Sequence, residues 1–277
     1  MMKSALSRYN DLTQRFVTGA FGAVVIIGSV IYGEWTYFAV FLLICIMTQL
    51  EFYRLLRLDD MLPLVSWGTF SGVTIFIIVF LEQNLLIKNK YYFTILPVLY
   101  IAFLIKLYRS TDDKPFTNIG LTFLGIIYVA MPFSFLHTIA FHSGNYQSGI
   151  VIGIIFLQWA SDIGAYFSGI KFGRRKLFER ISPKKSWEGF LGGTVLALGV
   201  SIVISKYFPI LEFWQWIGIA LIIVVVGTYG DLVESLFKRS MEIKDSGSSI
   251  PGHGGFLDRF DSLILSLPFI ALFLKIF

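Results

Sequence analysis

The residues best suited to chemistry lie between Asp231 and Asp261, in a polar segment that separates two long apolar stretches. The segment reads DLVESLFKRSMEIKDSGSSIPGHGGFLDRFD and holds six carboxylates, four Lys or Arg residues and one histidine. Asp231, Ser235 and Lys238 are spaced i, i+4 and i+7, so on a continuous helix they share one face. That face would present an acid, a hydroxyl and an ammonium group together.

A polar turn follows this face. Residues 246–255 read SGSSIPGHGG, and their Gly and Pro content excludes a regular helix. A turn of this kind can aim backbone N–H groups at phosphate oxygens. We expect a new helix near Phe256, on which Asp258 and Asp261 share a face at i, i+3. Carboxylates presented from two helical pieces across a polar turn suit a hard divalent cation, with Mg²⁺ the leading choice.

Some interpretations of this segment stay open. Arg239, Lys244 and Arg259 could simply pair with the acids in a solvated loop, and His253 could contact a phosphate or cap the turn. A zinc site is disfavoured, because the candidate ligands are oxygens without a set of His and Cys. Cys45 is the only cysteine, which excludes a disulfide or a Cys-based zinc site within one chain.

A second candidate is Asp162, about eight residues before the end of an apolar stretch that contains WASDIGAYFSGIKFG. An ionised carboxylate in hydrocarbon is costly, so such a residue usually faces a cavity, a partner charge or a metal. Glycines at 164, 169 and 173 would let a helix or a ligand approach closely. The alternative is a packing or snorkelling residue near the interface, and we favour a functional role.

A third candidate is the loop 171–189, which carries seven Lys or Arg residues against Glu179 and Glu188. It could be a topology determinant lying on anionic head groups. The run Ser182–Ser186 combines an expected turn with two ammonium groups and two hydroxyls, a set that could hold a polyphosphate or a lipid phosphate. The sequence contains no Walker A motif, so this is not a P-loop.

The composition indicates an integral membrane protein. Hydrophobic residues make up 56% of the 277 residues and charged residues only 15%, whereas soluble chains are about a quarter charged. The net charge of +5 is better explained by a cytoplasmic face and anionic lipid than by nucleic acid. An apolar run follows a basic N-terminal segment, and we interpret it as an uncleaved first span rather than a signal peptide.

Apolar runs of membrane-spanning length recur along the chain and predict an all-α polytopic protein with about nine transmembrane helices. Pro132 predicts a kink or a break in one of them. We expect a first unit over 1–149 that acts as scaffold and could contribute dimer contacts, and a catalytic unit over 150–277 with loops 171–189 and 231–261, together forming one continuous membrane domain. The expected spans are 16–32, 36–52, 62–81, 91–107, 117–141, 150–170, 190–208, 213–230 and 262–277.

The placement of positive charge orients these spans. With the N-terminus inside, all but four of the 23 Lys and Arg residues fall on the inner side. The four outer residues are Lys88, Lys90, Lys206 and Lys275. This predicts that both charged loops of the C-terminal half face the cytoplasm.

At these residues the chain resembles the phosphatidate cytidylyltransferase (CDP-diacylglycerol synthase) family. The resemblance covers chiefly 150–277, and two mild departures are Ile163 and Ser186, where many members have Thr. The signature positions are Ser235, Lys238-Arg239, Lys244-Asp245, Gly247, Pro251, His253-Gly254-Gly255, Asp258-Arg259 and Asp261. The upstream matches are Trp159, Asp162, Gly164-Ala165-Tyr166, Gly169, Gly173 and Ser182-Pro183-Lys184-Lys185.

The resemblance implies a magnesium-dependent reaction of CTP with phosphatidate that gives CDP-diacylglycerol and pyrophosphate. It also implies a paired-metal centre near the membrane surface, with the second metal ion of unknown identity, and a homodimer. The placement of positive charge predicts that this site faces the cytoplasm at the inner membrane, with no nucleic-acid partner. The implied metal ligands are Asp231, Asp258 and Asp261. The implied catalytic residues are Ser235, Lys238, Arg239, Lys244, Asp245 and Arg259. The implied substrate-binding residues are Asp162, Tyr166, Ser182, Lys184, Lys185, His253, Gly254 and Gly255.

Two other kinds of protein would fit parts of this pattern. A related CTP-using lipid enzyme, such as a polyprenol kinase or a CDP-archaeol synthase acting on ether lipids, would share much of this chemistry. A transporter or channel could also bury Asp162, but it has no evident need for Asp258-Arg259-Phe260-Asp261 beside a Gly-rich turn.

Overall fold

The computed structural model describes residues 2–57, 61–110, 112–243, 246–247, 249–250, 252 and 254–277, without the side chains of 2–12 and 15. Most of this chain is helical. The helices are α1 (Met2–Tyr32), α2 (Glu34–Leu56), α3 (Val65–Gln83), the 3₁₀ helix η2 (Asn89–Thr94), α4 (Ile95–Leu107), α5 (Pro115–Gly125), the π-helix η3 (Ile126–Ala130), α6 (Met131–Ala140), α7 (Ser148–Phe172), α8 (Trp187–Tyr207), α9 (Phe213–Ser240) and α10 (Leu257–Ile276).

The prediction of an all-α polytopic membrane protein is confirmed. In the part of the chain that the structure describes, seven helical segments are long and apolar enough to cross a bilayer. The apolar part of α1, Phe16–Tyr32, is shorter, and α10 carries four charged residues. The count of nine spans therefore stays a prediction. The seven segments are Glu34–Leu56, Val65–Gln83, Asn89–Leu107, Pro115–Ala140, Ser148–Phe172, Trp187–Tyr207 and Phe213–Ser240.

The predicted irregularity at Pro132 takes the form of a π-helical turn rather than a break. Helices α5 and α6 continue one another through η3, which ends two residues before the proline. Proline has no N–H and its ring clashes with the carbonyl four residues back, which here belongs to Tyr128. The wider π turn accommodates this clash without interrupting the helical path.

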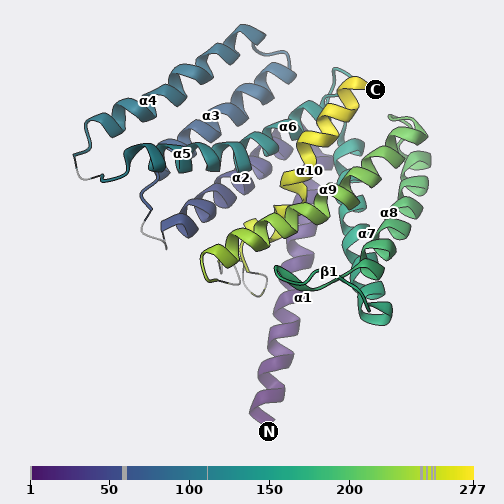
Figure 1. Cartoon of the computed structure of the whole chain (residues 1–277). Helices are drawn as coiled ribbons and strands as arrows, with labels where there is room; N and C mark the ends of the chain where they lie inside the picture. Colours follow the sequence, from purple (N-terminus) through teal and green to yellow (C-terminus); the bar gives the residue numbers. More distant parts are fainter. Residues whose placement is uncertain are drawn as a thin grey trace.

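Helices α7 to α10 pack against one another and form the second half of the bundle (Figure 1). Two aromatic pairs join this half to the first. Phe52 of α2 stacks on Phe237 of α9 with ring centroids 5.0 Å apart, and Phe133 of α6 meets Phe260 of α10 at 5.8 Å. The first half therefore contacts both helices that carry the acidic segment.

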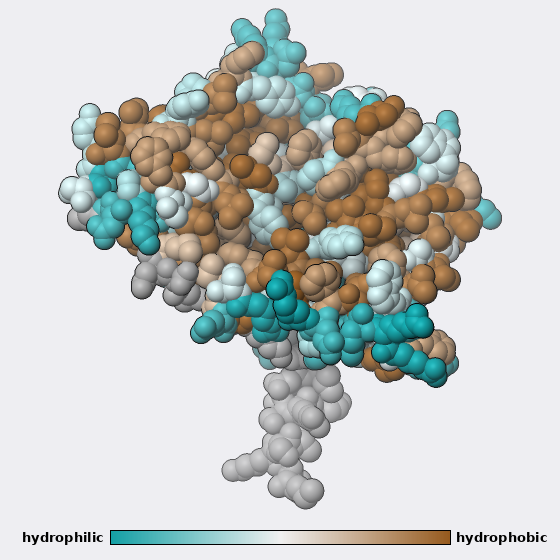
Figure 2. Space-filling view, viewed as in Figure 1, coloured by the Kyte–Doolittle hydropathy of each residue, from teal (hydrophilic) through white to brown (hydrophobic). Residues whose placement is uncertain are grey.

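Polar residues gather at one end of the bundle. Figure 2 shows apolar side chains over the broad middle of the molecule and a continuous band of hydrophilic ones along its lower edge, with smaller hydrophilic areas at the top and left. In the same view the hairpin after α7 and the C-terminal end of α9 lie at that edge (Figure 1). The two charged loops, which are far apart in the sequence, therefore meet at the same end.

The loop after α7 is a small β-hairpin. Strand β1 (Lys176–Phe178) pairs antiparallel with β2 (Ser182–Ser186). The expected turn over 182–186 is therefore wrong, because the chain reverses before Ser182. Ser186 then caps α8, its Oγ accepting the N–H of Gly189 at 3.1 Å.

Small residues bring α7 and α8 into close contact. A Cβ added to Gly164 of α7 would lie 2.6 Å from the carbonyl oxygen of Gly192 on α8. A Cβ added to Gly189 would lie 2.9 Å from the carbonyl oxygen of Ala165. Glycines at such positions allow helix backbones to approach closely in membranes. This contact fixes the hairpin relative to the polar residues of α7.

Candidate active site

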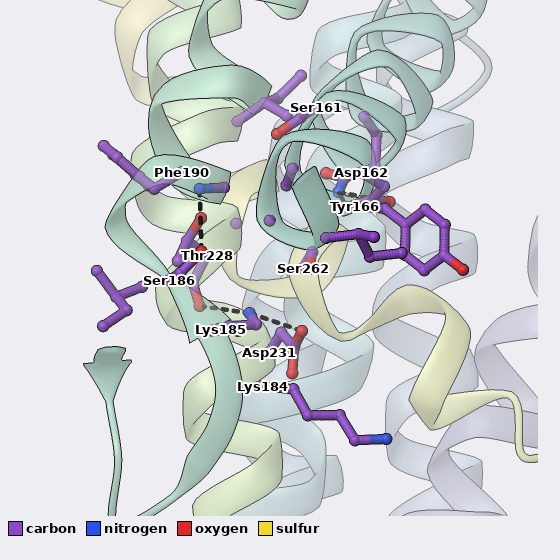
Figure 3. Close-up of a pocket in the computed structure, with 18 of the residues that line it drawn as sticks. Ser161, Asp162, Tyr166, Lys184, Lys185, Ser186, Phe190, Thr228, Asp231 and Ser262 are labelled. Carbon is purple, nitrogen blue, oxygen red and sulfur yellow. Dashed lines mark hydrogen bonds and ion pairs between the residues drawn. The ribbon is translucent and has the colours of Figure 1, made fainter. Parts of the chain in front are cut away.

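A cavity of about 580 Å³ opens between α7, the hairpin, α8 and α9 (Figure 3). Its lining includes five of the predicted substrate or metal residues. The cavity combines ammonium groups with carboxylates, so it can hold a substrate that carries several phosphates together with a cation. The five are Asp162, Tyr166, Lys184, Lys185 and Asp231.

An ion pair crosses this cavity. The Nζ of Lys185 on β2 lies 2.6 Å from Oδ2 of Asp231 on α9, and it also donates to the carbonyl oxygen of Thr228 at 3.4 Å (Figure 3). The side chains of Lys185 and Asp231 keep 25% and 37% of their surface exposed. Both groups are therefore accessible from the cavity, and the pair links the basic hairpin to the acidic helix.

Three carboxylates meet beside this pair. Asp231, Glu234 and Asp261 each offer one oxygen, and the three oxygens lie within 4.8 Å of one another. Glu234 is 1% exposed and Asp261 is 8% exposed. Crowding negative charge in a buried place is unfavourable unless protons or cations compensate it. We call Asp231, Glu234 and Asp261 the acidic cluster.

The acidic cluster offers oxygen donors that could hold a metal ion. All its donors are hard oxygens, the type that Mg²⁺ prefers. The Oε1 atom of Glu234 and the hydroxyl of Tyr128 are buried and have no hydrogen-bond partner among the described residues. Tyr128 comes from the π turn and interacts electrostatically with all three acids. A hydrated cation bound at the acidic cluster would supply partners for these unsatisfied polar atoms.

Asp258 lies outside the acidic cluster, although it shares a helix face with Asp261. Its Oδ1 accepts the ammonium of Lys238 at 2.7 Å. Its Oδ2 accepts the backbone N–H groups of Ser246 and Gly255 at 3.1 and 3.0 Å. Asp258 therefore fixes the polar turn in this structure, and its role as a metal ligand stays a prediction.

Lys238 joins these two groups of acids. Its Nζ lies 2.6 Å from Oε2 of Glu234, one turn earlier on α9, and 2.7 Å from Oδ1 of Asp258 on α10. Ser235 donates to Oδ1 of Asp231 at 3.1 Å, so the face predicted from the spacing of α9 is formed. Lys238 thereby balances charge between the acidic cluster and the polar turn.

Other predicted residues are not part of the cavity lining. Arg239 is exposed and donates to the carbonyl oxygen of Ile243 at 3.3 Å, and Arg259 is exposed at the start of α10. Ser182 pairs with Phe178 in the hairpin and is not part of the cavity lining.

Asp162 accepts the side-chain amide of Gln158 at 3.2 Å, and both residues line the cavity. Gly254 adopts a φ of +85°, which an L side chain rarely takes, and it bridges to Ile250. Gly255 contributes its N–H to Asp258. The predicted residues Lys244, Asp245 and His253 lie outside the described residues.

Comparisons with known proteins show the family of the chain. A model of the cytidylyltransferase family matches residues 13–277. The chain belongs to this family. A phosphatidate cytidylyltransferase of Bacillus subtilis is 34% identical over 276 residues, covering 96% of this chain and 99% of the relative. One from Haemophilus influenzae is 32% identical over 92% of this chain and 88% of its own. One from Pseudomonas aeruginosa reaches 44% identity over 126 residues, or 45% of this chain and 46% of its own.

The family match includes the first half of the chain as well as the signature. In the structure, Tyr128 of the first half lies beside the acidic cluster. Reasoning from the sequence missed Glu234, although its i, i+3 spacing from Asp231 could have revealed it. It also missed Tyr128, a residue of the first half. Nothing in its local sequence connects it to acids more than 100 positions away.

Proposed function

We propose that the chain transfers a cytidylyl group from CTP to phosphatidate, giving CDP-diacylglycerol and pyrophosphate. One observation carries the proposal: a buried acidic cluster beside a lysine-bearing cavity, at the polar end of helices that can cross a membrane. The relatives named phosphatidate cytidylyltransferase cover nearly the whole chain and support it.

In this reaction a phosphate oxygen of phosphatidate attacks the α-phosphorus of CTP. The new P–O bond forms as the bond from the α-phosphorus to the bridging oxygen breaks, and pyrophosphate leaves with that electron pair. The attacking oxygen is already anionic, so it needs little deprotonation. The obstacles are the repulsion between two phosphate groups and the need for in-line placement.

The chain's own residues meet these needs as follows. Asp231, Glu234 and Asp261 would hold Mg²⁺, which supplies charge neutralisation between the phosphates and at the departing pyrophosphate. Lys185 already pairs with Asp231. When substrate enters the cavity, the ammonium group of Lys185 can pair with a phosphate oxygen instead. Lys184 would hold either the triphosphate or the lipid head group. A second metal ion of unknown identity belongs to the same proposal.

The membrane setting completes the proposal. The polar end of the bundle would face the cytoplasm, since the charged loops there hold most of the Lys and Arg residues. CTP would then reach the cavity from the water phase while phosphatidate enters from the inner leaflet. We also propose a homodimer, on the resemblance to the family alone.

The product of the purified protein tests the assignment. With CTP, phosphatidate and Mg²⁺, we expect the mass of a CDP-lipid to appear and pyrophosphate to be released in equal amount. Chelation of Mg²⁺ should stop both. Two further substrates, an ether-lipid phosphate and a polyprenol, are offered in parallel to test the alternative functions. Preference for the ether-lipid phosphate over phosphatidate would indicate a CDP-archaeol synthase. A phosphorylated alcohol made from the polyprenol would replace the proposed function with a kinase.

A further inference from the structure

Glu51 of α2 lies next to a part of the chain that follows it by about 200 residues. It sits near the C-terminal end of its helix, and only 3% of its surface is exposed. None of the ion pairs among the described residues includes it. A buried carboxylate without a cation is costly unless hydrogen bonds compensate it, so its partners are informative.

Both carboxylate oxygens of Glu51 accept hydrogen bonds from the polar turn and the helix after it. Oε2 accepts the backbone N–H of Leu257 at 2.8 Å, and Oε1 accepts the hydroxyl of Ser249 at 3.2 Å. The contact is also tight. A Cβ on Gly247 or Gly255 would collide with this carboxylate. Two signature glycines thus make room for Glu51.

The hydrogen bond to Leu257 acts at a helix end, because Leu257 is the first residue of α10. The first four N–H groups of a helix have no partner within the helix, and a side chain just before the helix usually caps one of them. Phe256 occupies the cap position and offers no such group. Glu51 supplies the missing acceptor from α2, and its negative charge lies at the positive end of the helix dipole.

Helix α10 carries Asp258 and Asp261 in its first two turns. We propose that Glu51 is a positioning residue that caps α10 from another helix and thereby fixes where these two aspartates lie. Its effect on catalysis rests on the proposed function. The cap itself is a property of the fold that can be measured without substrate or metal.

Hydrogen exchange of the Leu257 amide in metal-free protein tests the cap directly. We expect Glu51→Ala to speed this exchange by at least about tenfold, because the amide loses the carboxylate that accepts its hydrogen bond. Glu51→Gln keeps one acceptor oxygen, so its exchange rate at Leu257 should lie between those of Glu51→Ala and the wild type. Gln49→Ala is the matched control, since Gln49 is equally buried on α2 but bonds to Tyr53 and Gly68 rather than to the turn. The control should leave exchange at Leu257 unchanged.

Kinetics provide the second measurement. We expect Glu51→Ala to raise the Mg²⁺ concentration for half-maximal CDP-lipid formation by roughly tenfold or more, with partial rescue in Glu51→Gln. A purely structural role would lower the amount of active enzyme and leave this concentration unchanged. Equal exchange at Leu257 in Glu51→Ala and Gln49→Ala would overturn the proposal.

The two hypotheses fail separately. Faster exchange in the Glu51 variants of a protein that makes no CDP-lipid would support the cap and overturn the proposed function. Unchanged exchange at Leu257 in the Glu51 variants of a protein that does make CDP-lipid would overturn the cap and support the proposed function. If Glu51→Ala does not fold, the comparison of Glu51→Gln with Gln49→Ala decides in the same way.

Discussion

The ammonium of Lys185 lies 2.6 Å from the carboxylate of Asp231, across a cavity that both residues line. The pair connects the hairpin to α9, two elements that are separate in the sequence and close in space. It also shows how the site can remain stable before substrate arrives, since the lysine neutralises one acid of the cluster. A phosphate entering the cavity would compete for that ammonium.

Substitutions of Lys185 and of its neighbour Lys184 should therefore change the kinetics in different ways. Lys185→Ala should lower kcat/KM by roughly ten- to a hundredfold, through loss of a charged hydrogen bond to the reacting phosphates. Lys184 is exposed and pairs with no acid among the described residues, so Lys184→Ala should chiefly raise KM. Steady-state kinetics with CTP and phosphatidate varied separately check this. A change in kcat alone for Lys184→Ala would contradict the assignment.

Glu234→Gln tests the residue that sequence reasoning missed. It removes one charge from the acidic cluster while keeping the size of the side chain. We expect activity to fall by on the order of a hundredfold or more at fixed Mg²⁺ and to recover in part as Mg²⁺ is raised. Glu242→Gln, at an exposed position just beyond α9, is the control and should behave like the wild type. Full activity of Glu234→Gln at low Mg²⁺ would remove Glu234 from the site.

Asp261→Asn and Asp258→Asn should both abolish most turnover, for different reasons. Asp261 belongs to the acidic cluster, whereas Asp258 holds the amides of Ser246 and Gly255. Hydrogen exchange at these two amides should rise in Asp258→Asn and stay unchanged in Asp261→Asn. Identical exchange in both variants would show that Asp258 does not fix the turn.

Packing between α7 and α8 gives a prediction on stability. Gly164→Ala would force a Cβ against the carbonyl oxygen of Gly192, whereas Gly199 of α8 has open space around it. The free energy of unfolding should differ between Gly164→Ala and Gly199→Ala by roughly 1–3 kcal/mol in favour of the latter. Thermal unfolding in the same detergent measures the difference. Equal Tm values would mean that the helices separate easily at this contact.

Much of the site could be predicted because it lies on short-range patterns. Helical spacing places Asp231, Ser235 and Lys238 on one face, and Gly and Pro place the turn before α10. Spacing alone predicts the same role for Asp258 and Asp261, because it does not show that Asp258 binds the turn while Asp261 joins the cluster. Glu51 could not be found, because its role depends on contacts with residues about 200 positions away.

The most direct measurement of the central claim is the binding of Mn²⁺, used as a spectroscopic substitute for Mg²⁺, to purified protein without substrate. Electron paramagnetic resonance titration should show bound Mn²⁺ in the wild type, competed by Mg²⁺, and a large loss of affinity in Glu234→Gln and Asp261→Asn but not in Glu242→Gln. Equal Mn²⁺ binding by all four proteins would contradict the proposal that the acidic cluster holds the cation.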